Sequence, residues 1–168
     1  KAAGATINEV LLAVFAGVMR ADLVARGDLP AEPLVSMVPL SLRELGDEGG
    51  NRLTCLLCNL GTHLADPVAR LSTIVASSTD GKRMLREMSP DAAAAYALVV
   101  MFPGIAATLL RFYENFWLPF NVVISNVPGP REPLYDNGAR LEAIYPLSLL
   151  YDREGINITV ISYQDELD

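Results

Sequence analysis

Residues 121–130 read Asn-Val-Val-Ile-Ser-Asn-Val-Pro-Gly-Pro, an apolar run that stops at two prolines with a glycine between them. A short apolar run that ends in turn residues is typical of a β-strand, so we expect a strand over 121–127. Pro128 followed by Gly129 suits the two central positions of a type II turn, which needs a positive φ at the glycine. Pro130 then stiffens the exit from the turn.

Four further segments are predicted as strands: 34–43, 52–60, 141–150 and 156–163. The polar, glycine-rich residues 46–51 form the turn between the first two of these strands. Pro39 removes a backbone donor from the first, so this position should lie at a sheet edge or at a bulge.

The first helix is predicted from a capping box, Thr6-Ile7-Asn8-Glu9, in which the Thr hydroxyl and the Glu carboxylate satisfy unpaired amides at a helix start. Gly27 supplies the stop. Between these signals, apolar residues recur at helical spacing and predict one buried face: Ile7, Val10, Leu11, Val14, Phe15 and Val18.

A second helix begins at Asp66-Pro67, with the aspartate as cap and the proline in the first helical position. Gly81 is its weak point, since glycine costs stability inside a helix. Its apolar positions predict an amphipathic helix: Val68, Leu71, Val75, Leu85 and Met88.

Residues 92–110 hold no charged side chain. Ser89-Pro90-Asp91 marks a helix start before them, and Pro103-Gly104 is expected to break the helix in the middle. A buried or groove-lining broken helix is the favoured interpretation. A segment at a lipid interface and a membrane span are the alternatives, because about 20 apolar residues cross a bilayer.

Composition limits the function classes. The chain has 168 residues and a net charge of −7. Because 51% of its residues are hydrophobic and its charges are not concentrated in runs, a disordered chain is excluded. The acidic balance argues against nucleic acid as a partner and against a polybasic grip on anionic lipid. Helices and strands mix without strict alternation, so we predict an α+β fold, a mixed sheet with packed helices. The chain is expected to be part of a longer protein.

The residues with reactive side chains give mostly structural interpretations. Cys55 and Cys58 have the spacing of a metal or redox pair, but within a strand they point to opposite faces, so we expect buried thiols, no metal site and a reducing compartment. His63 is the only histidine, and Asp66, which would have to orient it, is better used as a helix cap. We therefore expect a surface histidine.

Four polar residues remain open between structural and functional roles. Asn8 lies in the first turn of the first helix, and Asn126 closes the strand before the Pro-Gly-Pro turn. Asn157 and Thr159 share one strand face, which borders a cavity or is merely solvated. These residues alone do not identify a reaction.

Motifs spread along almost the whole chain carry a family resemblance. Read in order, they are Asn-Glu-Val-Leu-Leu-Ala (8–13), Met-Val-Pro-Leu-Ser-Leu-Arg (37–43), Gly-Asn (50–51), Asp-Pro with Arg-Leu (66–71), Ser-Asn-Val-Pro-Gly-Pro-Arg (125–131), residues 141–146, and Gly-Ile-Asn-Ile-Thr-Val-Ile-Ser-Tyr (155–163). With these motifs the chain resembles the C-terminal domain of the bacterial wax ester synthase/diacylglycerol acyltransferase (WS/DGAT) family.

The resemblance implies that residues 1–168 are the C-terminal lobe of a chloramphenicol-acetyltransferase-like, CoA-dependent acyltransferase fold. It implies transfer of a fatty acyl group from acyl-CoA to diacylglycerol or to a long-chain alcohol, with acyl-CoA as co-substrate and no covalently bound cofactor. The family's His-His-x-x-x-Asp-Gly motif belongs to the N-terminal lobe. Nothing here matches it, since His63 and Asp66 have the wrong spacing.

The resemblance also implies roles for residues of this chain. Asn8 would support the catalytic junction, beside Glu9 where the family usually has Asp. A rigid loop beside the acyl tunnel, with a polar strand face, would contact substrate: Asn126, Val127, Pro128, Gly129, Pro130, Asn157 and Thr159. No catalytic base is expected in this chain, so alone it should be inactive.

The implied partners are the N-terminal lobe, acyl-CoA, the acceptor, and a membrane or lipid-droplet surface that a cytoplasmic enzyme would touch peripherally. Two rival functions stay open. One is a catalytically silent, lipid-binding homologue. The other is a condensation-type domain that takes its acyl group from a carrier protein.

Overall fold

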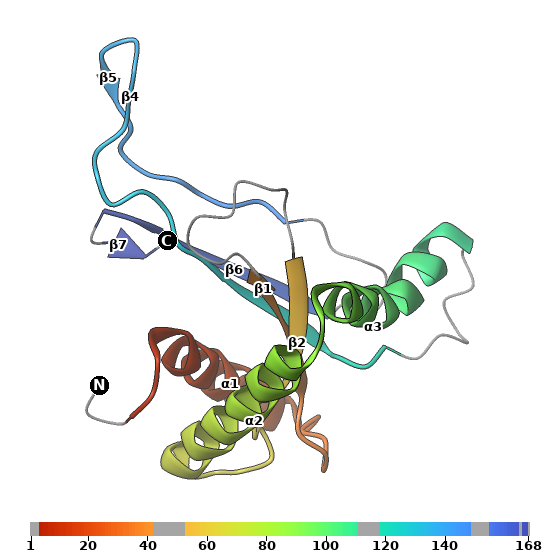
Figure 1. Ribbon diagram of the computed structural model, residues 1–168. Coiled ribbons are helices and arrows are strands. Elements are labelled where there is room, and N and C mark those ends of the chain that lie inside the picture. Colours follow the sequence, from red (N-terminus) through yellow and green to blue (C-terminus); the bar gives the residue numbers. More distant parts are fainter. Residues whose placement is uncertain (1–3, 42–52, 111–117, 149–154, 165, 168) are drawn as a thin grey trace.

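The computed structural model describes residues 4–41, 53–110, 118–148, 155–164 and 166–167 (Figure 1). The predicted turn at 46–51 and the last two residues of the segment 141–150 lie outside these ranges. The elements in chain order are α1 (Ile7–Arg26), β1 (Val35–Ser41), β2 (Leu53–Asn59), α2 (Pro67–Glu87), α3 (Pro90–Leu110), β3 (Val122–Val127), β4 (Tyr135–Asp136), β5 (Ala139–Arg140), β6 (Ile156–Tyr163) and β7 (Glu166–Leu167).

A mixed sheet organises the molecule. Its strand order is β2-β1-β3-β6-β7, with β1 antiparallel to β2 and parallel to β3, and with β3 parallel to β6. The predicted α+β class is confirmed. β1 pairs with β2 along its whole length but with β3 only at Ser36 and Met37. At Pro39, β1 has no β3 partner among the described residues, so this position is a local edge of the sheet. Proline has no backbone N–H to donate, and such an edge tolerates it.

Helices pack on both faces of this sheet. Val122 and Ile124 of β3 join one core cluster with Leu12 of α1 and Ile74 of α2. The intervening Val123 joins a second cluster with residues of α3. Since side chains alternate along a strand, α1 with α2 and α3 cover opposite faces.

The two cysteines follow this division. Cys55 belongs to the α3 cluster and Cys58 to the α1/α2 cluster, and both are buried and free. Burial raises the pKa of each thiol to about 11. The predicted buried thiols on opposite strand faces are confirmed.

Capping residues set the helix boundaries as predicted. At α1 the Thr6 side chain accepts from the Glu9 amide and the Glu9 side chain accepts from the Thr6 amide, while Gly27 ends the helix in the left-handed region. At α2 the Asp66 carboxylate accepts from the amides of Val68 and Ala69. These caps satisfy amides that the helix itself leaves unpaired.

The predicted buried face of α1 is wrong. The buried residues are Glu9, Leu12, Ala16 and Met19, whereas four members of the predicted face are exposed: Ile7, Val10, Val14 and Val18. Both sides of the helix are apolar, so periodicity alone could not distinguish the side that meets this chain's own core.

The predicted break in the third helix is also wrong. α3 runs from Pro90 to Leu110 with Pro103 inside it. A proline costs one helical hydrogen bond. Buried side chains on both sides of it, Val100 and Ala106, keep the helix packed. In the part of the chain that the structure describes, no helix is both long and apolar enough to span a bilayer.

Residues 141–148, predicted as strand, have no regular secondary structure. Pro146 lacks a backbone donor, and Tyr145 and Leu147 are exposed rather than alternating with a buried face. The segment crosses near the sheet and contacts it through side chains, since the Ser148 and Thr159 hydroxyl oxygens lie 2.9 Å apart.

A short hairpin, β4 and β5, projects from the body of the molecule (Figure 1). Asn137 and Gly138 at its tip both have positive φ, as a type I′ turn requires. Its base is tied to the sheet by the buried Tyr163. The Tyr163 hydroxyl donates to the Leu141 carbonyl oxygen at 2.8 Å and accepts from the Leu134 amide at 3.0 Å.

Replacing Tyr163 with phenylalanine should lower the free energy of unfolding of the full-length protein by about 1–2 kcal/mol, because both hydrogen bonds of a buried hydroxyl disappear. Limited proteolysis should then cut the hairpin faster. The control is Tyr135→Phe, since Tyr135 is exposed on the hairpin itself. Equal effects of the two variants on cleavage would contradict this anchoring role.

Candidate functional site

The Pro-Gly-Pro loop follows β3 and is fastened to the end of β6. The Gly129 amide donates to the Ser162 hydroxyl at 2.9 Å, and the Gln164 amide donates to the Pro130 carbonyl at 2.8 Å. These two bonds hold the loop at the carboxyl ends of two neighbouring parallel strands, where sheets of this kind commonly position functional groups.

Gly129 is required for a reason other than the predicted one. Its φ lies outside the left-handed region, so the expected type II turn is wrong. A Cβ on Gly129 would lie 1.9 Å from the Ser162 carbonyl oxygen. Glycine is needed here because the loop backbone approaches the β6 backbone closely.

A polar pocket of about 520 Å³ lies beside β6 and is lined by Asn157, Thr159, Ser148 and Pro146, among others. The Thr159 hydroxyl donates to the Asn157 side-chain oxygen at 3.1 Å. A threonine hydroxyl has one proton, so in the 2.9 Å contact Ser148 must be the donor to Thr159. Three side chains thus form one directed chain of hydrogen bonds along the pocket wall.

The predicted site residues fall on two faces of the sheet. Asn157 is the register partner of Val123, so Asn157 and Thr159 face the same side as α3. Asn126 alternates with them and faces the α1/α2 side, with Ile124. The structure therefore brings Asn157 and Thr159 together but places Asn126 on the other face.

Asn8 lies on the Asn126 side of the sheet. α1 runs antiparallel to β3, because Met19 and Arg26 near its end line one cavity with Val122 at the start of β3. The first turn of α1 is therefore directed toward the Pro-Gly-Pro end of the sheet (Figure 1). Asn8 is half-buried there.

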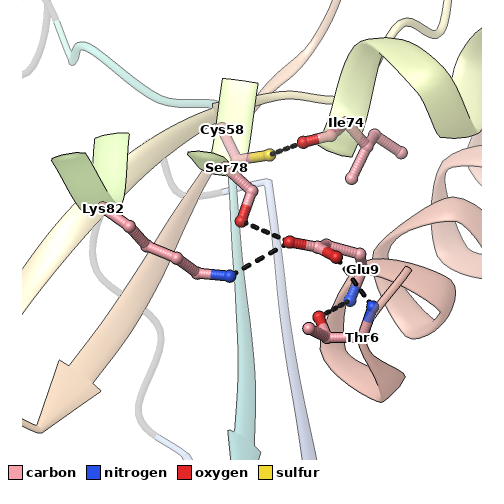
Figure 2. A network of polar contacts seen from close by, with 6 residues as sticks. All are labelled: Thr6, Glu9, Cys58, Ile74, Ser78 and Lys82. Atoms are coloured by element: carbon pink, nitrogen blue, oxygen red, sulfur yellow. Dashed lines mark hydrogen bonds and ion pairs between the residues drawn. The ribbon is translucent and has the colours of Figure 1, made fainter. Parts of the chain in front are cut away.

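Glu9, beside Asn8, is the centre of a polar network that joins α1 to α2 (Figure 2). Its carboxylate is buried, with 4% of the residue exposed. Oε2 accepts from the Thr6 amide at 2.8 Å, while Oε1 accepts from the Ser78 hydroxyl and from Lys82 Nζ, each at 3.0 Å. The ion pair with Lys82 fixes the position of the first turn of α1 relative to α2.

These contacts control the ionisation of Glu9. Burial by itself raises the pKa of the carboxyl, but the hydrogen bonds from Thr6, Lys82 and Ser78 outweigh it and lower the pKa from 4.5 to about 2. Glu9 is therefore a carboxylate throughout the physiological range. It acts as a fixed negative charge that holds α1, since a group with this pKa is a poor proton donor or acceptor near neutral pH.

A larger cavity of about 770 Å³ opens at the far end of α1. Met19, Leu23, Phe120 and Ile156 give it apolar walls, and the Asp22–Arg26 ion pair lies in its lining. None of the residues predicted for the site lines it. Its chemistry suits a hydrocarbon with a polar end, the usual composition of a small-molecule pocket.

Sequence reasoning missed Ser148, Ser78 and Lys82. The sequence predicts Ser148 in a strand over 141–150, but residues 141–148 have no regular secondary structure. Only the tertiary structure brings Ser148 to Thr159, eleven residues along the chain. For Ser78 and Lys82 a signal exists, since polar residues four apart on a helix share one face. Their partner lies about seventy residues away, and nothing local identifies it.

His63 is exposed in a turn, as predicted, and Asp66 serves as the α2 cap. Among the described residues, no three His, Cys, Asp or Glu side chains gather in a way that would hold a metal ion. The polar groups that the described structure gathers beside the polar pocket are the hydroxyl and amide groups of Ser148, Thr159 and Asn157.

Comparison with known proteins agrees with this architecture. The family model of the WS/DGAT C-terminal domain matches residues 49–168. The O-acyltransferase WSD of Acinetobacter baylyi is 44% identical over 168 residues, which cover 100% of this chain and 36% of that protein. A Mycobacterium tuberculosis protein named as a diacylglycerol O-acyltransferase is 47% identical over 168 residues, which cover 99% of this chain and 38% of that protein.

A solved structure gives the same result. The wax ester synthase/diacylglycerol acyltransferase from Marinobacter aquaeolei VT8 matches with a TM-score of 0.80 and 36% identity, over 99% of this chain and 37% of that one. The fold is thus an α+β domain of the kind found in CoA-dependent acyltransferases. The chain belongs to the WS/DGAT C-terminal domain family, and it spans 36–38% of the length of these relatives.

Proposed function

We propose that this chain is the C-terminal lobe, over residues 1–168, of an O-acyltransferase that moves a fatty acyl group from acyl-CoA to diacylglycerol or to a long-chain alcohol. The observation that carries the proposal is its 44–47% identity to proteins named as O-acyltransferases, over nearly all of its length. The relatives are longer, which supports a second lobe in the complete enzyme.

The proposed reaction takes its base from the rest of the protein. A histidine of the other lobe accepts the proton of the acceptor hydroxyl, and that oxygen attacks the thioester carbon. The carbon–sulfur bond then breaks, and CoA leaves as the thiol after receiving a proton. We do not assign this role to His63, which is exposed in a turn and whose neighbour Asp66 caps α2.

This chain would supply contacts to the acyl-CoA. In the polar pocket Ser148 donates to Thr159 and Thr159 donates to Asn157, so the proton of Ser148 is used and its exposed oxygen can serve as an acceptor. The pantetheine arm of CoA carries amide and hydroxyl donors that suit such acceptors. The pocket polarity therefore supports acyl-CoA as the donor.

Replacing Thr159 with valine in the full-length enzyme should raise the KM for acyl-CoA about tenfold and change kcat little. The change keeps the side-chain shape and removes two hydrogen bonds, and one bond is worth about 1 kcal/mol. Thr79→Val on the exposed face of α2 is the matched control. An unchanged KM for acyl-CoA in the Thr159 variant would show that the polar pocket does not bind acyl-CoA.

The outward side of α3 supports contact with lipid. Leu98, Val99, Phe102 and Leu109 are exposed, and the opposite side of the helix packs Ala97 and Val100 into the core. Phe and Leu are the side chains that an interfacial helix inserts at the boundary of a lipid layer. We place the enzyme in the cytoplasm, with this face meeting the membrane or lipid droplet that holds its acceptor.

Two assays separate this function from its rivals. Full-length enzyme with palmitoyl-CoA should form ester with diacylglycerol or hexadecanol, and the same acyl group on a carrier protein should be a poor donor. Preference for the carrier would indicate a condensation-type enzyme. Binding of lipid vesicles with no ester from either donor would indicate a silent lipid-binding homologue.

A further inference from the structure

The exposed side of α1 carries no charged or polar side chain over its first four turns. Between Ile7 and Ala21 every exposed residue of the helix is apolar. The largest of them are Ile7, Val10, Val14 and Val18, exposed by 69%, 45%, 55% and 62%. Spacings of three and four residues align these four side chains along one side of the helix. We call them the outer stripe.

The outer stripe is the second apolar side of α1. The opposite side is already buried, with Leu12, Ala16 and Met19 in the core. That buried side meets α2 and the sheet, since Leu12 shares its core cluster with Ile74 of α2 and Val122 of β3. A helix with apolar residues on two opposite sides normally buries both of them.

The neighbouring helix α2 shows what a solvated helix face looks like in this protein. Its exposed positions are mostly polar: Ser72, Thr79, Asp80, Arg83, Arg86 and Glu87, with Pro67, Val68 and Ala76 as the apolar ones. The exposed side of α2 therefore has the composition of a surface that faces solvent. The exposed side of α1 has the composition of a surface that contacts a partner.

We infer that the outer stripe is the docking surface for the part of the parent polypeptide that this chain does not span. This inference rests on the proposal that the chain is one lobe of a larger enzyme. About two-thirds of the length of the relatives lies outside the matched region, so the second lobe is expected to be larger than this chain. The surface is aliphatic, so the occupant is an apolar face of that second lobe.

The side chains of α1 argue against lipid as the occupant. A helix that lies on a membrane inserts Trp, Phe or Leu from its apolar face, as α3 would with Leu98, Phe102 and Leu109. The outer stripe consists of valine and isoleucine alone. It therefore suits the packed face of a protein better than the surface of a lipid layer.

Docking on the outer stripe also gives Asn8 a position. Asn8 is half-buried in the same first turn as Ile7, and the ion pair between Glu9 and Lys82 holds that turn. A lobe that packs on Ile7 and Val10 would bring its own residues to Asn8. The amide would then lie at the junction of the two lobes.

Cysteine labelling of the full-length protein tests the inference. Val14→Cys and, as a second position, Val18→Cys place a thiol on the outer stripe, and Ala76→Cys places one on the exposed side of α2. Val14, Val18 and Ala76 are all exposed in this chain, so the variants should fold. Maleimide should modify both stripe thiols about tenfold more slowly than the α2 thiol, and all three equally in denaturant.

Equal labelling at the stripe and at α2 would overturn the inference. Protection that disappears on dilution to a monomer would assign the stripe to a second copy of the chain, and protection seen only with added lipid vesicles would assign it to a membrane. Either result also overturns it. Labelling needs no turnover, so equal labelling would overturn the docking inference and leave the acyltransferase proposal intact. A protein whose stripe thiols are protected but that forms no ester would instead refute the acyltransferase proposal alone.

Discussion

Replacing Gly129 with alanine in the full-length protein is expected to lower the free energy of unfolding by about 3 kcal/mol, the upper end of the cost of overpacking. The new Cβ would lie 1.9 Å from the Ser162 carbonyl oxygen and 3.1 Å from its carbon. The obstacle is backbone, which cannot rotate away as a flexible side chain does. The loop must therefore move away from β6 and lose the bond from the Gly129 amide to Ser162.

The same shift should reduce ester formation. The loop begins directly after β3, whose partner β6 carries Asn157 and Thr159 in the polar pocket. We expect acyl transfer by the Gly129→Ala enzyme to fall by about tenfold or more, since small displacements at a site cost large factors in rate.

Gly81→Ala is the matched control, because it makes the same chemical change in the opposite context. Gly81 lies inside α2, and its Cβ would meet the Leu56 side chain at 3.4 Å, an ordinary contact. Helix propensity then favours alanine by up to about 1 kcal/mol. Urea unfolding should show one variant destabilised and the other unchanged or stabilised. A stable Gly129→Ala protein with full activity would contradict the close approach at β6.

The second large effect is expected at Glu9. Glu9→Gln removes the negative charge that faces Lys82 and Ser78, and should lower the free energy of unfolding of the full-length protein at pH 7 by about 2–3 kcal/mol. The control is Asp80→Asn, which removes an exposed partner of Arg83. Exposed ion pairs contribute little, so that change should cost less than about 0.5 kcal/mol.

The pH dependence isolates the role of the carboxylate. Glu9 has a folded-state pKa of about 2 and an ordinary value of 4.5. The unfolded chain thus binds the proton more tightly, so the stabilisation is complete above pH 4.5 and is lost as the pH falls from 4.5 toward 2. The stability difference between wild type and Glu9→Gln should shrink by about 1.4 kcal/mol per pH unit in that window. A difference that is constant from pH 7 to pH 3 would contradict the low pKa.

Local signals in the sequence were sufficient to predict the helices that begin at capping residues and the strands that form continuous apolar runs. The Thr6–Glu9 capping box, the Asp66 cap and the apolar runs of β2, β3 and β6 all lie where the sequence predicted them. These features depend on neighbours within about four residues, which is the range that sequence patterns describe.

The errors came where tertiary contacts decide. The sequence showed that α1 is rich in apolar residues, but the face predicted to be buried, which includes Val10 and Val14, points away from this chain's core. Periodicity identifies an apolar face of a helix but not the element that packs against it. Gly129 was correctly singled out but for the wrong reason, since the β6 backbone that excludes a side chain is 33 residues away.

The candidate site was predictable only in part. Asn157 and Thr159 share a face by strand alternation, and the structure adds their hydrogen bond. Ser148 completes that chain from a segment that was expected to be a strand. The buried partners of Glu9 depend on how two helices pack, which neither helix sequence specifies alone.

The central claim is that this chain is one lobe of an acyltransferase whose reaction needs both lobes. The most direct measurement is ester formation from palmitoyl-CoA with diacylglycerol and with hexadecanol, by the full-length protein and by the 168-residue chain alone. We expect ester from the full-length protein and none from the chain, since the proposed catalytic histidine belongs to the other lobe. No ester from the full-length protein with either acceptor, or ester from the chain alone, would contradict the claim.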